Sequence, residues 1–262
     1  DPAVGRRRPV TTSAAHLHRY CFPMAKLDTL TLRVTDPQAQ RQFYCDAFGM
    51  CDRGDGRVGY SSRETAIRFE IAEGAYVPQP ADNYWKIALS VPNIELAWSQ
   101  LQEAGVSCSE PEQFRDIGYL AHVTDPAGFT VELIDHCFEG DRRDVTYDKT
   151  LLGGGAHLNL ITLRTADIDA VELDLLRWGM TPLAVQPVEP YGFTLYFYAF
   201  TDERPPSANL QAIENRPWLY QRPYSVLEIQ HVHDLSVESP PAQGSSGYGG
   251  LTISSTDVET IS

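Results

Sequence analysis

The sequence predicts an α+β fold built from tandem, paired strand–helix–strand–strand–strand (βαβββ) units. The first observation is a recurring β-rich run, which reads LDTLTLRVTD at 27–36, YWKIALSVPN at 84–93, LNLITLRTAD at 158–167 and GGLTISSTD at 249–257. The second is that a helix-like segment and further strand-like runs follow each of the first three. Repetition of this kind indicates one structural unit that is used several times.

Each element of the unit has its own local signal. The recurring runs are alternating or rich in β-formers, which is typical of strands. The helix-like segments carry apolar residues at helical spacing and end at Gly49, Gly105 and Gly179, the residue that most often terminates a helix. Further strands are expected at 56–62, 65–72, 118–124, 129–134, 193–200 and 224–232.

The repeats define the expected domains. The units that begin near residues 27 and 84 form a first domain, 25–137, and those that begin near 158 and 249 form a second, 156–262. Residues 138–155 are polar and end in glycines, as expected of a linker. The last unit is incomplete, because only a strand and the start of a helix, TDVETIS, precede Ser262.

Charge separates a basic N-terminal arm, 1–24, from an acidic body. The net charge is −14, and residues 1–26 account for +4 of it. Such an acidic chain is a poor candidate for sequence-independent nucleic-acid binding, and no apolar run is long enough to span a membrane. The arm is interpreted as an organelle-targeting remnant, an ordered arm or a solvated tail, so plastid, mitochondrion and cytoplasm all stay open.

Several segments together resemble the vicinal oxygen chelate superfamily, and more closely glyoxalase I (lactoylglutathione lyase). IALSVPNIELAWSQLQEAGV followed by GYLAHVTDPAGFTVELI looks like the closing module of that enzyme. FTLYFYAFTDERPP and WLYQRPYSVLEIQH look like the end of its opening module. The resemblance covers about residues 25–262 and implies a fused, two-domain glyoxalase whose sites combine modules from both halves.

The resemblance also implies a ligand set for a divalent ion such as zinc or nickel. In the family a Gln or His, a Glu, a His and a second Glu hold the metal, which polarises the substrate, and a metal-bound carboxylate moves the proton. Carried over to this chain, one site comprises Leu160, Glu228, Lys86 and Glu132. The catalytic carboxylates are then Glu132 and Glu228.

The other implied site comprises Thr29, Glu70 and Gly250, with a fourth ligand position beyond Ser262. The metal-ligand positions that keep a carboxylate are thus Glu70, Glu132 and Glu228, whereas Thr29, Lys86, Leu160 and Gly250 replace the other ligands. Leucine cannot ligate, and a lysine ammonium has no lone pair to donate. Lys86 is therefore interpreted as neutralising Glu132 and Glu228 in a buried salt bridge. The alternatives are a site with a changed ligand set and different chemistry, or simple surface exposure of these groups.

Two arginines match the position that contacts a glutathione carboxylate in the family, Arg33 and Arg164. A guanidinium suits that role because it binds a carboxylate through two parallel hydrogen bonds. An ordinary arginine at a strand end is the alternative interpretation for each.

Two functions stay open at this point. One is a non-catalytic binding or structural subunit, derived from a lactoylglutathione lyase, that needs no cofactor and associates with other protein subunits. The other is an active lyase or isomerase that takes glutathione hemithioacetals, with zinc or nickel held by an altered ligand set. Fold resemblance favours the second, whereas the residues at the ligand positions favour the first.

Overall fold

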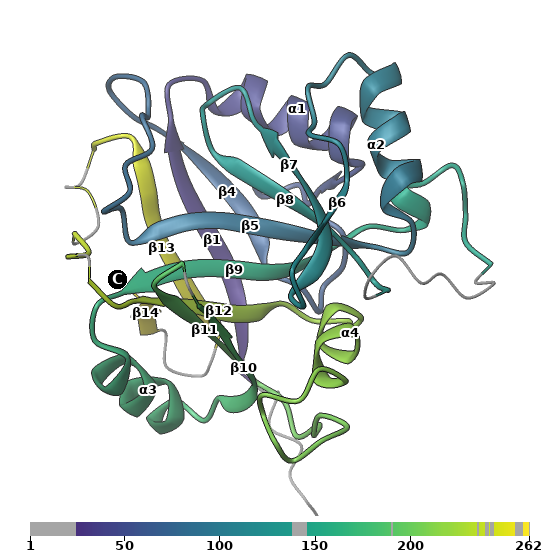
Figure 1. Cartoon of the computed structure of the whole chain (residues 1–262). Helices are drawn as coiled ribbons and strands as arrows, with labels where there is room; N and C mark the ends of the chain where they lie inside the picture. Colours follow the sequence, from purple (N-terminus) through teal and green to yellow (C-terminus); the bar gives the residue numbers. More distant parts are fainter. Residues whose placement is uncertain are drawn as a thin grey trace, which may run out of the picture.

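The computed structural model describes residues 25–137, 146–189, 191–234, 236–238, 241, 244–254 and 259–261. The predicted basic arm, 1–24, lies outside the described residues, as does the 138–145 part of the predicted linker. Mixed sheets flanked by a few helices make up the described chain (Figure 1), which confirms the predicted α+β class.

The first module shows how the sequence sets each element. Its first strand buries Leu27, Leu30 and Leu32, and Asp36 then caps the helix by accepting hydrogen bonds from two backbone N–H groups of the first turn. The helix ends at Gly49, whose φ of 71° lies in the region that glycine adopts without strain. The elements are β1 (Lys26–Val34), α1 (Pro37–Phe48), β2 (Cys51–Asp52), β3 (Arg57–Gly59) and β4 (Ala66–Ile71).

The second module repeats this order. It comprises β5 (Tyr84–Val91), α2 (Ile94–Glu103), β6 (Glu112–Phe114), β7 (Gly118–Thr124) and β8 (Thr130–Asp135). Asn93 caps α2 as Asp36 caps α1. A short 3-10 turn, η2 (Leu152–Gly154), then leads into the second half of the chain.

The third module adds a short helix before its last strand. Its elements are β9 (His157–Thr165), α3 (Ile168–Arg177), β10 (Thr181–Val188), β11 (Phe193–Ala199), α4 (Asn215–Tyr220) and β12 (Val226–Val232). Strand β10 was not among the predicted strands, because it contains Pro182 and Pro187. It lies at a sheet edge, where a missing N–H donor is tolerated.

The last segment differs from the prediction. After β13 (Gly247–Ser254), where a strand was expected, the chain forms β14 (Glu259–Ile261) and not the start of a helix. Strand β14 pairs antiparallel with β13 and so satisfies its backbone groups at once. A helix of so few residues is unfavourable, because its first turn fixes several residues for a single hydrogen bond.

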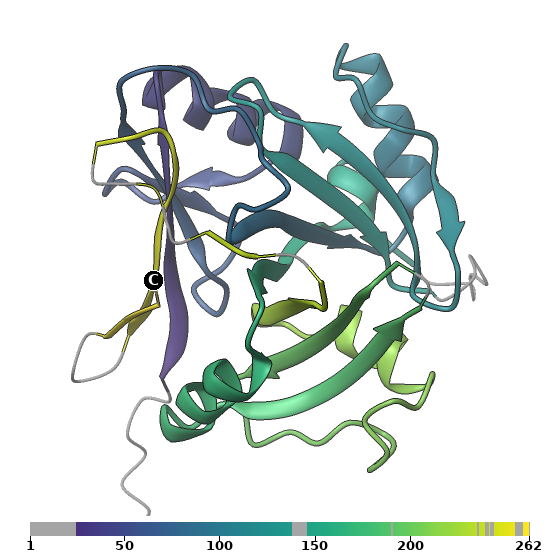
Figure 2. The same ribbon diagram turned by 60° about the vertical axis from the view of Figure 1, so that its left-hand side comes forward.

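Two sheets join modules from opposite halves of the chain. The eight-stranded sheet has the order β10-β11-β12-β9-β5-β8-β7-β6, with β9 of the third module antiparallel to β5 of the second. The six-stranded sheet has the order β14-β13-β1-β4-β3-β2, with β13 antiparallel to β1. Figure 1 shows β5 and β9 side by side, and Figure 2 shows β1 with β13.

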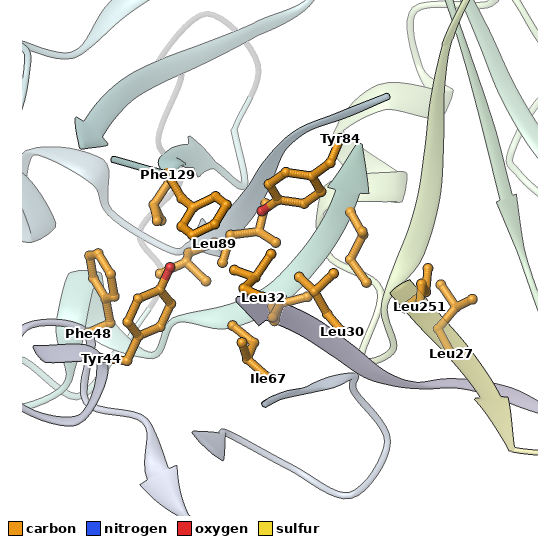
Figure 3. Packing of buried hydrophobic residues seen from close by; sticks show 14 of the residues in the cluster. Leu27, Leu30, Leu32, Tyr44, Phe48, Ile67, Tyr84, Leu89, Phe129 and Leu251 are labelled. Carbon is orange, nitrogen blue, oxygen red and sulfur yellow. The ribbon is translucent and has the colours of Figure 1, made fainter. Parts of the chain in front are cut away.

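A single apolar core connects the first two modules. Leu30 and Leu32 of β1 and Tyr44 of α1 belong to the same buried cluster as Tyr84 of β5 and Phe129 (Figure 3). Tyr84 packs edge-on against Phe129, with ring centroids 5.9 Å apart. The core therefore fixes the position of β5, which carries Lys86 on its opposite face.

Candidate functional site

A buried lysine lies between two buried carboxylates at the junction of β5 and β9. Lys86 Nζ is 2.9 Å from Glu132 Oε1 and 3.1 Å from Glu228 Oε2. All three side chains are almost fully excluded from solvent. The strand register explains the contact, because Lys86 of β5 and Glu228 of β12 are both paired with Thr162 of β9. The predicted Lys86–Glu132–Glu228 cluster is thus formed.

Neighbouring side chains also bind the two carboxylates. Thr162 donates its hydroxyl hydrogen to Glu228, and His122 Nε2 lies 3.2 Å from Glu132 Oε2. His122 was not singled out from the sequence. It lies directly opposite Glu132 in the β7–β8 pairing, so only a correct strand register reveals it.

Opposite charges keep the cluster ionised. Burial disfavours the ammonium, but the two carboxylates outweigh it and hold the pKa of Lys86 above its ordinary value. Burial likewise disfavours ionised Glu132, yet Lys86 and His122 lower the pKa of this carboxyl below its usual range. The cluster therefore holds one ammonium between two buried acidic side chains, and His122 lies beside Glu132.

The donor set at this place does not fit a divalent metal. Of the four ligand positions implied by the resemblance, Glu132 and Glu228 retain oxygen donors, whereas Leu160 offers none and Lys86 is a cation. Lys86 Nζ also occupies the hydrogen-bonding positions of both carboxylates. Among the described residues, no group of three or more histidine, cysteine or acidic side chains is arranged to hold a metal.

A cavity of about 360 Å³ opens beside the cluster, inside the curled eight-stranded sheet. Its lining is mostly apolar and aromatic. The lining residues are Trp85, Lys86, Glu112, Phe114, Ile117, Leu120, His122, Glu132, Ile134, Leu160, Gln186, Tyr191, Phe193, Leu195, Phe197, Tyr220 and Glu228. Its size falls in the range of small-molecule sites, which is roughly 300–1,000 Å³.

The two ends of the sheet meet over this cavity. Phe114 of β6 packs against Tyr191, which precedes β11, with ring centroids 5.4 Å apart. Tyr220 at the end of α4 donates its hydroxyl to the backbone oxygen of Ile117, at 2.7 Å. Contacts between the second and third modules thus enclose the space beside Lys86.

The second implied site does not assemble. Thr31 in β1 occupies the place that Thr162 occupies in β9. Thr162 is paired with Lys86 on one side and Glu228 on the other, and Thr31 is paired in the same way with Gly250 and Arg68. Gly250 then matches Lys86, as expected, but Arg68 and not Glu70 matches Glu228. The assignment of Glu70 is corrected accordingly. Glu70 is exposed, and it lies opposite Arg33 on the adjacent strand.

A cation also occupies the neighbourhood of Thr29. Arg57 Nη1 donates to Thr29 Oγ1 at 2.8 Å and lies 2.9 Å from Asp28 Oδ2. Gly249 lies close to β1, because a Cβ atom there would come within 2.8 Å of a Thr31 methyl. Close strand packing and an arginine thus take the place of a cluster.

The two expected substrate arginines are both held by the protein. Arg164 donates from Nε to Gln230 Oε1 at 2.8 Å and lies over the Trp85 ring, 5.1 Å from its centroid. Burial lowers the pKa of Arg164. Arg33 reaches the backbone oxygen of Pro241 at 3.5 Å. Neither contact shows a glutathione-binding role, which stays a prediction.

Comparison with known proteins places the fold. Residues 26–133 match the model of the Glyoxalase/Bleomycin resistance protein/Dioxygenase superfamily. The structure of glyoxalase I from Zea mays is similar with a TM-score of 0.60 at 17% identity, covering 87% of this chain and 74% of that one. A variant of the same maize enzyme gives a TM-score of 0.60 at 17% identity, covering 88% and 75%. No curated protein matches.

These similarities confirm the predicted resemblance to the glyoxalase fold. At this level of identity they show the fold alone, so the chemistry has to be argued from the residues. Within the described chain, no helix is both long and apolar enough to cross a membrane.

Proposed function

We propose that this protein is a metal-independent, non-catalytic binding or structural subunit. Its residues 26–133 match the glyoxalase superfamily, and its fold is similar to that of glyoxalase I from Zea mays. The observation that carries the proposal is Lys86, buried between Glu132 and Glu228 at the ligand positions. Its ammonium supplies the positive charge that a divalent ion supplies in glyoxalase I. It provides no vacant coordination position for a substrate oxygen.

The adjoining cavity supports binding rather than scaffolding alone. It has the size and the apolar lining of a ligand site, and a few polar groups converge on it. The residues around it are fixed by the cross-module contacts of Tyr191 and Tyr220. A pre-formed site of this kind binds a small molecule without a large ordering cost.

The proposal is tested by metal analysis of the purified protein together with a hemithioacetal isomerase assay. We expect no stoichiometric zinc, nickel or iron and no turnover of the methylglyoxal–glutathione adduct, with maize glyoxalase I as the positive control. Stoichiometric metal with turnover that a chelator abolishes would support an active lyase with altered ligands and contradict the proposal.

A further inference from the structure

One polar group in the cavity has an unmet hydrogen-bonding requirement. Gln186 of β10 lines the cavity and is fully buried, and its side-chain oxygen has no hydrogen-bond partner among the described residues. A buried acceptor that is left without a donor destabilises the fold, because it has lost its hydrogen bonds to water. A ligand that donates a hydrogen bond would meet this requirement. Because the surface of Oε1 is closed in this structure, the neighbouring lining side chains have to shift to admit the donor.

Tyr220 fixes which end of the Gln186 amide is unpaired. The Tyr220 hydroxyl gives its hydrogen to the backbone oxygen of Ile117, so toward Gln186 it can only accept. The Gln186 amide nitrogen consequently points to Tyr220, at 3.4 Å, and Oε1 is the atom left without a donor. Hydrogen-bonding logic thus settles the amide orientation.

The rest of the lining selects against anions. Glu112, Glu132 and Glu228 line the cavity together with Lys86, which both buried carboxylates already engage, and His122, whose Nε2 lies 3.2 Å from Glu132. An anionic ligand would meet excess negative charge in a partly desolvated space, where repulsion is weakly screened. The remaining walls are mainly aromatic and aliphatic, and they suit a planar ring that packs edge-on or offset against Phe and Tyr side chains.

We propose that this cavity binds a small, neutral aromatic molecule that donates a hydrogen bond, through a hydroxyl or amine, to Gln186 Oε1. This ligand class rests on the proposed binding function and specifies it. It differs from a glutathione conjugate, whose carboxylates would face Glu132 and Glu228. The modest cavity volume fits a ligand of two or three fused rings.

Three matched probes test the proposal in fluorescence titrations of the full chain at pH 7. The probes are 2-naphthol, which is neutral and donates, 2-methoxynaphthalene, which is neutral without a donor, and 2-naphthoate, which is anionic. We expect 2-naphthol to bind about five- to tenfold more tightly than 2-methoxynaphthalene, and 2-naphthoate to bind most weakly. Equal binding of the two neutral probes, or no binding of any probe, would overturn the proposal.

The variant Gln186→Leu assigns the preference to one atom. It should reduce 2-naphthol binding to the level of 2-methoxynaphthalene and leave the latter unchanged. Gln42→Leu, on the exposed face of α1, should keep the full preference. If Gln186→Leu keeps it too, Gln186 is not the recognised acceptor and the proposal fails.

The outcomes also separate the ligand class from the proposed function. Tight binding of 2-naphthoate by a protein without metal or turnover would overturn the ligand class alone. Metal-dependent turnover of the hemithioacetal would overturn the proposed function, whatever the probe preference.

Discussion

The two sheets are assembled by the same rule, yet among the described residues only the eight-stranded sheet has a buried lysine between two carboxylates. In the eight-stranded sheet, Thr162 lies between Lys86 and Glu228, and a cavity opens beside them. In the six-stranded sheet, the equivalent Thr31 lies between Gly250 and Arg68. The comparison teaches that pairing of the modules creates a place for a site, whereas a few inward-facing side chains decide whether one exists.

Charge replacement in the eight-stranded sheet gives the largest expected effect. Lys86→Met leaves Glu132 and Glu228 buried without a counter-charge, and removing one partner of a buried ion pair typically costs about 3–5 kcal/mol. Urea unfolding at pH 7 measures the loss. Adding Glu132→Gln and Glu228→Gln should restore most of the stability, and an unchanged unfolding free energy in Lys86→Met would refute the buried-pair interpretation.

Acid should weaken the eight-stranded sheet through a second buried group. Burial lowers the pKa of His157, at the start of β9, to about 4, so the fold favours the neutral imidazole. The unfolded chain binds this proton first, and stability is lost as the pH falls from about 6.5 to 4, by up to about 3 kcal/mol. The fold holds His157 beside His136, with ring centroids 5.5 Å apart.

The variant His157→Phe isolates this effect. Wild type and variant have to be compared at each pH, because burial raises the pKa of Asp125 to about 6 and protonation of this carboxyl favours the fold in the same acid range. We expect the unfolding free energy of the wild type, minus that of His157→Phe, to decrease as the pH is lowered from 7 to 4 in urea unfolding. A difference that stays constant with pH would show that His157 is not held neutral.

Supplying the missing donors should create a metal site at the Lys86–Glu132–Glu228 cluster. The double variant Lys86→His with Leu160→Gln places nitrogen and oxygen donors beside Glu132 and Glu228. Zinc at about 100 times its dissociation constant should then raise the unfolding free energy by about 2.7 kcal/mol. Lys86→Met with Leu160→Gln, which lacks the nitrogen donor, is the control, and an equal response in both would contradict the ligand assignment.

The smallest effect is expected in the six-stranded sheet. Arg57 is partly exposed, with 24% of its side chain accessible, and it contacts Asp28 and Thr29. Arg57→Met should therefore cost about 1 kcal/mol or less in the same unfolding assay. A loss as large as that of Lys86→Met would mean that both sheets depend on a central charge, and the contrast between them would disappear.

The sequence predicted the modules and the Lys86 cluster but not the full site. Repeated strand runs and terminal glycines locate the elements, because these signals are local. The match of Glu70 differs from the observed register by two residues, because β1 and β4 are separated in the chain by a helix and two strands and no local motif sets their offset. Gln186 of β10 and Tyr220 of α4 meet because α4 packs against β10, and no local pattern encodes that tertiary contact.

The exchange of modules between the halves has a consequence for folding kinetics. Pairing β5 with β9 closes a loop of roughly 75 residues, whereas contact between Thr29 and Thr252 spans 223 residues. Loop-closure entropy makes the longer connection less favourable by about 1 kcal/mol. The eight-stranded sheet should therefore form first and bring β13 within reach of β1, so the halves expressed separately would each lack the partner strands that complete them.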